Sequence, residues 1–84
     1  MKMDIGAEIS LYPLTADCIP PIEDFIGRLS REGELRVVTN SMSTQLFGPY
    51  DLVMGRLVRE LRGTFENSSK AVFVMKVLGP LAEP

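Results

Sequence analysis

The chain has 84 residues, of which 24% are charged and 45% hydrophobic, and its formal net charge is −2. This composition is typical of one small globular domain, residues 1–84, and argues against disorder. The slight negative charge argues against a nucleic-acid-binding protein, whose affinity depends on a basic surface. The sequence has no histidine, which excludes the catalytic pairs and metal sites that need an imidazole.

The single cysteine, Cys18, cannot form an intramolecular disulfide, so the sequence is not that of a disulfide-stabilised secreted scaffold. Its neighbours Asp17 and Ile19 supply no positive charge that would activate the thiol, and we expect an inert residue before a helix. No signal-peptide pattern follows Met1, and no apolar run approaches the ~20 residues of a membrane span. We therefore expect a cytoplasmic protein without membrane insertion.

Residues 4–12 alternate in character, which predicts a first strand. Its apolar face consists of Ile5, Ala7, Ile9 and Leu11, and its other face of Gly6, Glu8, Ser10 and Tyr12. Pro13 is expected to end the strand, because proline cannot donate a hydrogen bond to a neighbouring strand.

A first helix is predicted after Cys18, with Asp17 as a possible cap and with Pro20 and Pro21 in its first turn. Its apolar stripe has the helical spacing i, i+3, i+4, i+7 and consists of Ile22, Phe25, Ile26 and Leu29. Gly33 is expected just past its C-terminus, with a positive φ.

Residues 35–39 and 42–47 predict a second and a third strand, joined by a turn at Asn40 and Ser41. A second helix is expected to begin at Asp51, its N-cap, and to end at Gly63. Its predicted apolar stripe is Met54, Leu57, Val58 and Leu61, and its predicted solvated face carries Arg56, Arg59 and Arg62. A loop at 67–69 and a last strand at 70–78, ended by Gly79 and Pro80, complete the chain.

The predicted order of elements is βαββαβ. It indicates a ferredoxin-like α+β fold, a four-stranded antiparallel sheet with two helices on one face. Right-handed crossovers place the first and third strands side by side in the middle of the sheet.

The face of the sheet away from the helices is the predicted binding surface. Glu8, Ser10 and Tyr12 lie on this face of the first strand, about 7 Å apart. The third strand adds Ser43 and Gln45 on one face and Thr44 on the other. An ordinary wetted sheet face is the alternative, but hydroxyls, an amide, an aromatic ring and one acid are groups that orient a small molecule.

The last strand is apolar on both faces, with Lys76 as its single charge. Because the chain is too short to cover the open face, we expect a homodimer or homotetramer whose sheets face each other.

Three segments of the sequence together resemble the thiamine/hydroxymethylpyrimidine-binding YkoF-like family. They are residues 9–14 (ISLYPL), 19–22 (IPPI) and 39–48 (TNSMSTQLFG), and the resemblance extends from Ile5 to about Pro80. It implies a ferredoxin-like domain that binds thiamine or its pyrimidine precursor without catalysis and without a cofactor. The best-known members carry two such domains in tandem, whereas this chain has one.

Two other functions remain open on the sequence alone. One is a regulatory module of similar fold that binds another small molecule, such as an amino acid, between subunits. The other is a small enzyme of the dimeric α+β type, which the absence of histidine and of a clustered acid pair disfavours.

Overall fold

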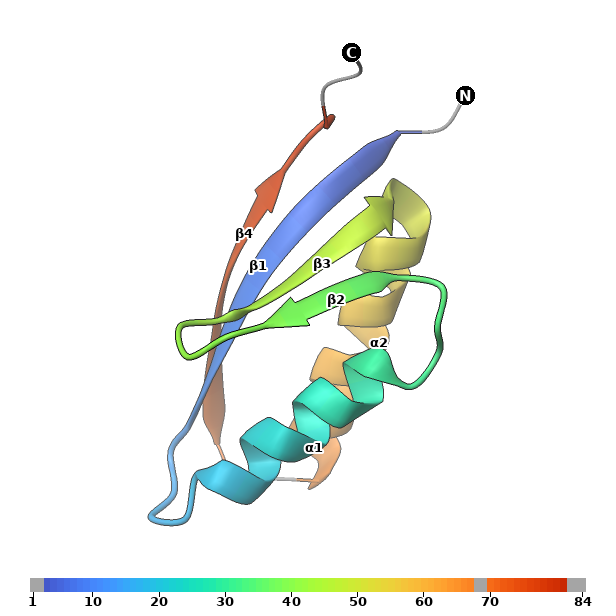
Figure 1. Ribbon diagram of the computed structural model, residues 1–84. Coiled ribbons are helices and arrows are strands. Elements are labelled where there is room, and N and C mark those ends of the chain that lie inside the picture. Colours follow the sequence, from blue (N-terminus) through green and yellow to red (C-terminus); the bar gives the residue numbers. More distant parts are fainter. Residues whose placement is uncertain (1–2, 68–69, 82–84) are drawn as a thin grey trace.

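The computed structural model describes residues 3–67 and 70–81, so Ser68 and Ser69 of the predicted loop lie outside the described residues. The elements are β1 (Asp4–Pro13), α1 (Ile19–Ser30), β2 (Arg36–Thr39), β3 (Thr44–Pro49), α2 (Tyr50–Asn67) and β4 (Ala71–Leu78). The strands form one antiparallel sheet in the order β2-β3-β1-β4, and both helices lie on one side of it (Figure 1). The predicted ferredoxin-like α+β fold, with the first and third strands in the middle, is confirmed.

The core lies between the sheet and the helices, where the predicted alternation in β1 is also confirmed. All four apolar residues of that strand, Ile5, Ala7, Ile9 and Leu11, are buried. They pack with Phe25 and Leu29 of α1, Leu46 of β3, and Val53 and Leu57 of α2. The polar set of β1 is therefore on the open face, as the period-two pattern requires.

The ends of α1 differ from the prediction. The helix ends at Ser30, with Arg31 as its cap, and no described residue has a positive φ, so Gly33 is not a left-handed cap. The C-terminal end of the helix is capped by a side chain instead, because Arg56 donates from Nη1 to the carbonyl oxygen of Leu29 at 3.0 Å. At the other end the N-cap position is Cys18, with no side-chain capping bond, rather than Asp17.

Gly63 was wrongly predicted as the end of the second helix. It lies inside α2, which continues to Asn67. A Cβ on Gly63 would lie 2.7 Å from Nη1 of Arg28. The glycine therefore gives the Arg28 guanidinium room against α2. Likewise, Asp51 lies within the first turn and not at the N-cap, because the helix begins at Tyr50.

The predicted solvated face of α2 is also wrong in part. Arg56 is only 4% exposed, whereas Val58, placed in the predicted apolar stripe, is 67% exposed. Arg59 and Arg62 are exposed, as predicted. Hydropathy misplaced Arg56 because its guanidinium has partners on another segment, the Leu29 carbonyl oxygen and the Glu32 and Glu34 carboxylates.

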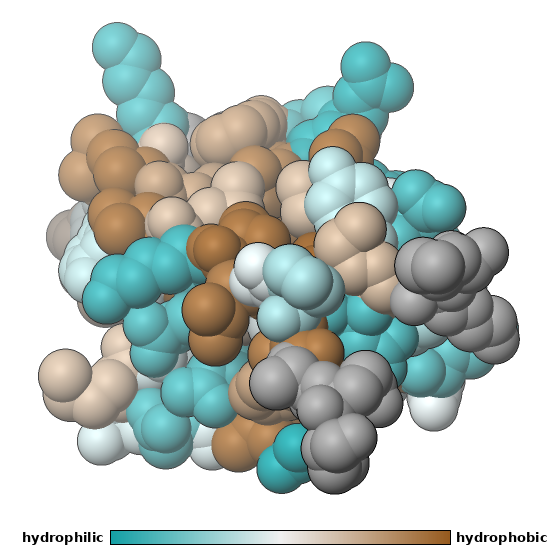
Figure 2. Space-filling view, turned by 90° about the horizontal axis from the view of Figure 1, so that it is seen from above, coloured by the Kyte–Doolittle hydropathy of each residue, from teal (hydrophilic) through white to brown (hydrophobic). Residues whose placement is uncertain are grey.

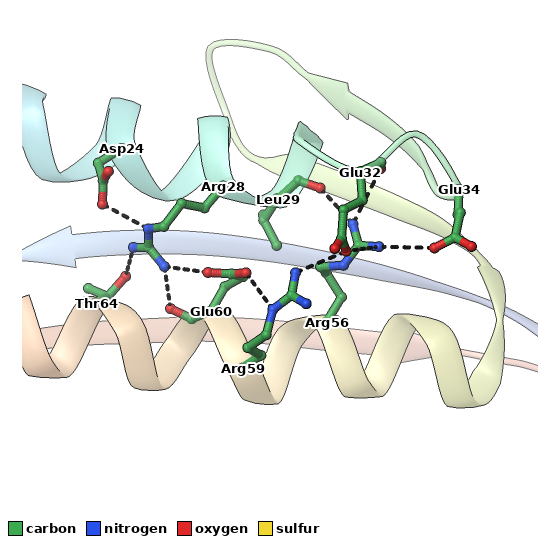
Figure 3. A network of polar contacts seen from close by, with 9 residues as sticks. All are labelled: Asp24, Arg28, Leu29, Glu32, Glu34, Arg56, Arg59, Glu60 and Thr64. Carbon is green, nitrogen blue, oxygen red and sulfur yellow. Dashed lines mark hydrogen bonds and ion pairs between the residues drawn. The ribbon is translucent and has the colours of Figure 1, made fainter.

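Charged and polar side chains form the contact between α1 and α2 (Figure 3). Arg28 donates to the Glu60 carboxylate at 2.7 Å, to its carbonyl oxygen at 2.9 Å and to Thr64 at 2.6 Å. Arg28 also pairs with Asp24 at 2.8 Å, and Arg59 pairs with the second oxygen of Glu60 at 2.8 Å. Within the described residues no buried side-chain nitrogen or oxygen lacks a partner.

The hairpin of β2 and β3 has a longer turn than predicted, because β3 begins at Thr44 and not at Met42. The side chain of Asn40 makes this turn. Its Oδ1 accepts from the backbone N–H groups of Met42 at 2.8 Å and Ser43 at 3.1 Å. The backbone N–H of Asn40 closes the turn on the Ser43 carbonyl at 3.1 Å.

β4 forms one edge of the sheet, and the helices pack mainly against the other strands. Phe73 is half-buried between Phe25 and Phe65, with ring centroids 4.9 and 5.5 Å away. Beyond it, residues 74–78 are exposed on both faces. Seen from above, apolar side chains reach the surface between hydrophilic ones (Figure 2).

In residues 3–67 and 70–81, no helix combines the length and apolar character needed to cross a membrane.

Candidate functional site on the open face and at the end of the sheet

Glu8 lies at the centre of the open face. It is directly opposite Gln45 on β3 and Lys76 on β4, so the three side chains form a row across three strands. Ser43, just before β3, donates from Oγ to Oε2 of Glu8 at 2.9 Å. Gln45 approaches the same oxygen at 3.5 Å, and Nζ of Lys76 lies 3.8 Å from Oε1.

These partners keep Glu8 ionised at neutral pH. The hydrogen bond from Ser43, followed by that from Gln45, holds the pKa of the Glu8 carboxyl below its usual value of 4.5. Both bonds use Oε2, while Oε1 has only the distant ammonium of Lys76. Because the Glu8 side chain is 40% exposed, Oε1 is available to accept a hydrogen bond from a ligand.

A hollow of about 310 Å³ adjoins this carboxylate. Its lining residues are Gly6, Ala7, Glu8, Gln45, Phe47, Lys76 and Leu78. A Cβ on Gly6 would lie 3.1 Å from the Phe47 ring, so the glycine lets this ring approach the strand. The guanidinium of Arg36 lies 5.0 Å from the centre of the same ring. The hollow thus has an acid on one side and an aromatic wall on another.

A second cavity, a cleft of about 270 Å³, opens at the end of the sheet. The pairing of β1 with β3 stops at Ile9 and Thr44, so the last residues of β1 separate from the hairpin turn. Polar walls come from Ser10, Tyr12, Thr39, Asn40, Ser41, Ser43 and Thr44, and the apolar lining from Ile9, Leu11, Ile22, Phe25, Ile26 and Met42. The cleft therefore combines an apolar wall with several hydroxyl and amide groups that can orient a small molecule.

The hairpin turn is attached to β1 at this cleft. Oγ of Ser10 donates to the carbonyl oxygen of Met42 at 3.3 Å. Ser43 lines the cleft and also binds Glu8. Ser43 therefore connects the cleft with the hollow, and the two cavities share one polar row.

The six predicted site residues fall into two groups. Glu8 and Gln45 line the hollow, while Ser10, Tyr12, Ser43 and Thr44 line the cleft. Thr44 reaches the cleft from the core side of the sheet. It is 4% exposed, and its hydroxyl lies 3.1 Å from that of Thr39. Thr44 is thus the one predicted residue that does not share the open face with Glu8.

Two residues of the hollow were missed by the sequence reasoning. Lys76 was noted only as an interruption of an apolar strand, and Phe47 was assigned only to the third strand. The signal that could have identified Lys76 is its place as the one charge of the last strand, on the face where an antiparallel neighbour can set it opposite Glu8. Phe47 carried no such signal, because its place depends on the glycine across the strand pair.

Among the residues that the structure describes, no three His, Cys, Asp or Glu side chains come together as a metal site. Cys18 lies half-buried at the start of α1 and lines neither cavity. The side chains around the two cavities supply hydrogen bonding, charge pairing and stacking.

No protein-family model matches the sequence, and no curated protein sequence matches it. Solved structures do match the fold. A protein from Thermotoga maritima, assigned provisionally to thiamine biosynthesis or salvage, has a TM-score of 0.79 and 17% identity, over 88% of this chain and 81% of its own. A hypothetical protein from Methanocaldococcus jannascii has a TM-score of 0.81 and 21% identity, over 98% and 86%.

A protein from Streptococcus pneumoniae has a TM-score of 0.79 and 24% identity, over 96% of this chain and 90% of its own. At these identities the likeness establishes the fold alone. This chain is thus similar in fold to a group of small proteins that includes one connected with thiamine.

Proposed function

We propose that this chain is a cytoplasmic, non-catalytic protein that binds thiamine or its hydroxymethylpyrimidine precursor in the salvage or supply of vitamin B1. The observation that carries the proposal is the Glu8 carboxylate. Ser43 holds one of its oxygens, and the other faces an open hollow. The low pKa of this group means that it meets a ligand as an anion.

The chemistry of an aminopyrimidine suits this arrangement. Its exocyclic amine donates to a carboxylate oxygen, and a protonated ring nitrogen pairs with the same group. The hydroxyls of Ser10 and Ser43 and the phenol ring of Tyr12 lie beside the cleft, where they can bind ring nitrogens and stack on the ring. The thiazolium cation of thiamine also favours a carboxylate and an aromatic wall.

Two comparisons support the ligand class. The Thermotoga maritima protein, similar in fold at 17% identity, is provisionally connected with thiamine. The three sequence segments that resemble the YkoF-like family lie mostly around the two cavities: residues 9–12, 22 and 39–44 line the cleft, and residues 45 and 47 the hollow. Membership in that family is part of the proposal.

We also propose that the protein self-associates as a homodimer or homotetramer and has no nucleic-acid partner. Exposed Val72, Val74 and Leu78 on the open face of β4 support self-association, since soluble monomers rarely expose such apolar strands. The net charge of −2 gives no basic surface for a nucleic acid.

Calorimetric titration tests the ligand. The purified protein is titrated with thiamine, hydroxymethylpyrimidine and a panel of amino acids, and Glu8→Gln is compared with the matched surface variant Glu23→Gln on α1. Loss of a charged hydrogen bond of about 1.5–3 kcal/mol is expected to weaken pyrimidine binding by about ten- to hundredfold in Glu8→Gln. Glu23→Gln should bind like the wild type.

Three outcomes contradict the proposal. Binding of an amino acid but of neither pyrimidine would favour the regulatory module instead. Wild-type affinity in a folded Glu8→Gln variant would remove Glu8 from the site. Mass spectrometry of the titrated ligand checks the absence of catalysis, because a new product mass would show an enzyme.

A further inference from the structure

The second half of β4 is exposed on both of its faces. On the open face Val74 is 52% exposed and Leu78 69%. On the helix face Met75 is 41% exposed and Val77 50%. The sequence predicted an uncovered open face only, so the exposure of Met75 and Val77 is a new observation. It arises because both helices pack over the other strands (Figure 1).

The two edges of the sheet differ in a way that concerns assembly. β2, at one edge, has four residues and places Arg36 over the Phe47 ring. β4, at the other, has eight residues, about 27 Å of strand, with Lys76 as its only charge. Among the described residues, no strand pairs with the outer side of β4. Natural proteins usually protect a long apolar edge by charges, prolines, bulges or a covering element.

Packing the open faces of two sheets together would not protect this strand. It would cover Val74 and Leu78 but leave Met75 and Val77 in water, because those side chains point to the helix side. A strand added at the edge pairs with the free backbone groups of β4 and contacts its side chains on both faces, because the side chains of the added strand alternate in the same way.

We propose that the outer edge of β4 pairs antiparallel with β4 of a second copy of this chain, joining two four-stranded sheets into one of eight strands. The inference rests on the proposed self-association and specifies its contact.

A second copy is the occupant that fits the composition of the strand. Antiparallel pairing of a strand with itself around a two-fold axis sets open-face residues against open-face residues and helix-face residues against helix-face residues. An axis at Met75 sets each Lys76 opposite Val74 of the second copy, so that the two ammonium groups are not directly opposed. Each Lys76 also keeps its own Glu8, 3.8 Å away.

The exposed side of α2 extends the same apolar surface. Phe65 contacts Phe73 of β4, and Val58 lies two turns earlier on the helix, 67% exposed. In the joined sheet the two β1 strands would be three strand spacings apart, about 14 Å. This separation accommodates one α2 from each copy, since a helix with its side chains is about 10–12 Å wide. On the helix side of the sheet, the two α2 helices would therefore flank the seam, which is the contact between the two β4 strands.

Two sets of lysine variants distinguish edge pairing from stacking of open faces. Multi-angle light scattering is measured for the wild type, for the helix-face variants Met75→Lys and Val77→Lys, and for the open-face variant Val74→Lys. We expect a wild-type mass of at least two 9.3 kDa chains. Val74→Lys sets a second ammonium group opposite Lys76 of the other copy, and Met75→Lys and Val77→Lys each place a charge in the apolar contact between the two α2 helices. Both sets should therefore weaken the dimer more than about tenfold. Ile19→Lys, at an exposed apolar residue at the start of α1, is the matched control and should not change the mass.

Cysteine cross-linking tests the same contact without placing a charge in it, so a variant that fails to fold is less of a concern. In a Cys18→Ser background, Met75→Cys should form an intermolecular disulfide on mild oxidation, because paired Cα atoms of neighbouring strands lie within disulfide range. Arg36→Cys on the opposite edge should remain reduced.

Three results would overturn the edge contact. An oligomer that keeps its mass in Met75→Lys and Val77→Lys, but not in Val74→Lys, indicates stacked open faces. Cross-linking at Arg36→Cys without cross-linking at Met75→Cys assigns the contact to β2. A wild-type mass of one chain at micromolar concentration excludes self-association, and it leaves the ligand proposal to the titrations.

Discussion

The two sides of the sheet place a glutamate in opposite surroundings. Glu60, on the helix side, is buried and accepts from Arg28 and Arg59 with both oxygens. Glu8, on the open side, is partly exposed and has one oxygen without a close donor. Both carboxyls have a lowered pKa, but the causes differ. The comparison shows that a carboxylate with both oxygens hydrogen-bonded stabilises the fold, whereas a carboxylate with one oxygen free of close donors is available to a ligand.

At Glu60, burial and hydrogen bonding have opposite effects on the pKa of the carboxyl. Burial alone raises the pKa of its carboxyl, and the hydrogen bonds from Arg28 and Arg59 outweigh that effect and lower it. At Glu8 the hydrogen bonds from Ser43 and Gln45 lower the pKa and burial opposes them only weakly. Removing a partner should therefore cost much more on the helix side than on the open side.

The largest expected effect is that of Arg28→Met. This change leaves Glu60 buried beside α1 without its main partner, and breaking a buried pair costs about 3–5 kcal/mol of unfolding free energy. Urea unfolding followed by circular dichroism measures it. Arg62→Met, on the exposed side of α2, is the control and should change stability by less than about 0.5 kcal/mol. Equal effects in the two variants would show that the interhelical cluster contributes little.

The two glutamates give a direct second comparison. Glu60→Gln should lower the unfolding free energy by about 1.5–3 kcal/mol, since it loses charged hydrogen bonds. Glu8→Gln, at a partly exposed residue, should leave the unfolding free energy close to that of the wild type while it weakens ligand binding. The same urea titration applied to both variants tests this difference. A larger loss of stability in Glu8→Gln would make Glu8 a structural residue.

The pH dependence of stability follows from the same shifts. The pKa of Glu60 in the folded protein lies below 4.5, the value expected in the unfolded chain. Its contribution is therefore fully present above about pH 4.5 and is lost as the pH falls through the folded pKa. Thermal melts from pH 7 to pH 3 should show this loss. Glu60→Gln should show a smaller decline, and an unchanged decline would assign the acid sensitivity to other carboxyls.

Smaller effects are expected at the cleft. Ser10→Ala removes a hydroxyl that lines the cleft, and loss of its neutral hydrogen bond to the ligand should weaken binding by about 0.5–1.5 kcal/mol. Tyr12→Leu keeps apolar contact but loses stacking, at a cost of about 1 kcal/mol. Titration of both variants with hydroxymethylpyrimidine measures these changes. If both bind like the wild type while Glu8→Gln does not, the ligand occupies the hollow and not the cleft.

The smallest expected effect is that of Cys18→Ser. The thiol makes no capping hydrogen bond and lines neither cavity. Affinity for the ligand and unfolding free energy should both stay within about 0.5 kcal/mol of the wild type. A large loss of affinity in the folded variant would give Cys18 a role that the structure does not indicate.

Most of the open-face row could be predicted from the sequence, because strand alternation assigns each side chain to a face. Glu8, Ser10 and Tyr12 follow from that rule alone. Their neighbours across the sheet could not be predicted, because partners depend on register. The register sets Lys76 opposite Glu8 and ends the pairing of β1 with β3 at Ile9 and Thr44, which opens the cleft.

By itself the sequence determined the order of the elements, the buried face of β1 and the ferredoxin-like sheet, because local periodicity and chain connectivity are enough for these. Tertiary structure alone decided which charges are buried. Arg56 and Glu60 lie inside because each finds partners on another segment, and Gly63, inside α2, leaves the space that the Arg28 guanidinium occupies. The exposure of Met75 and Val77 was likewise decided by where the helices pack, since hydropathy describes a side chain and not its neighbours.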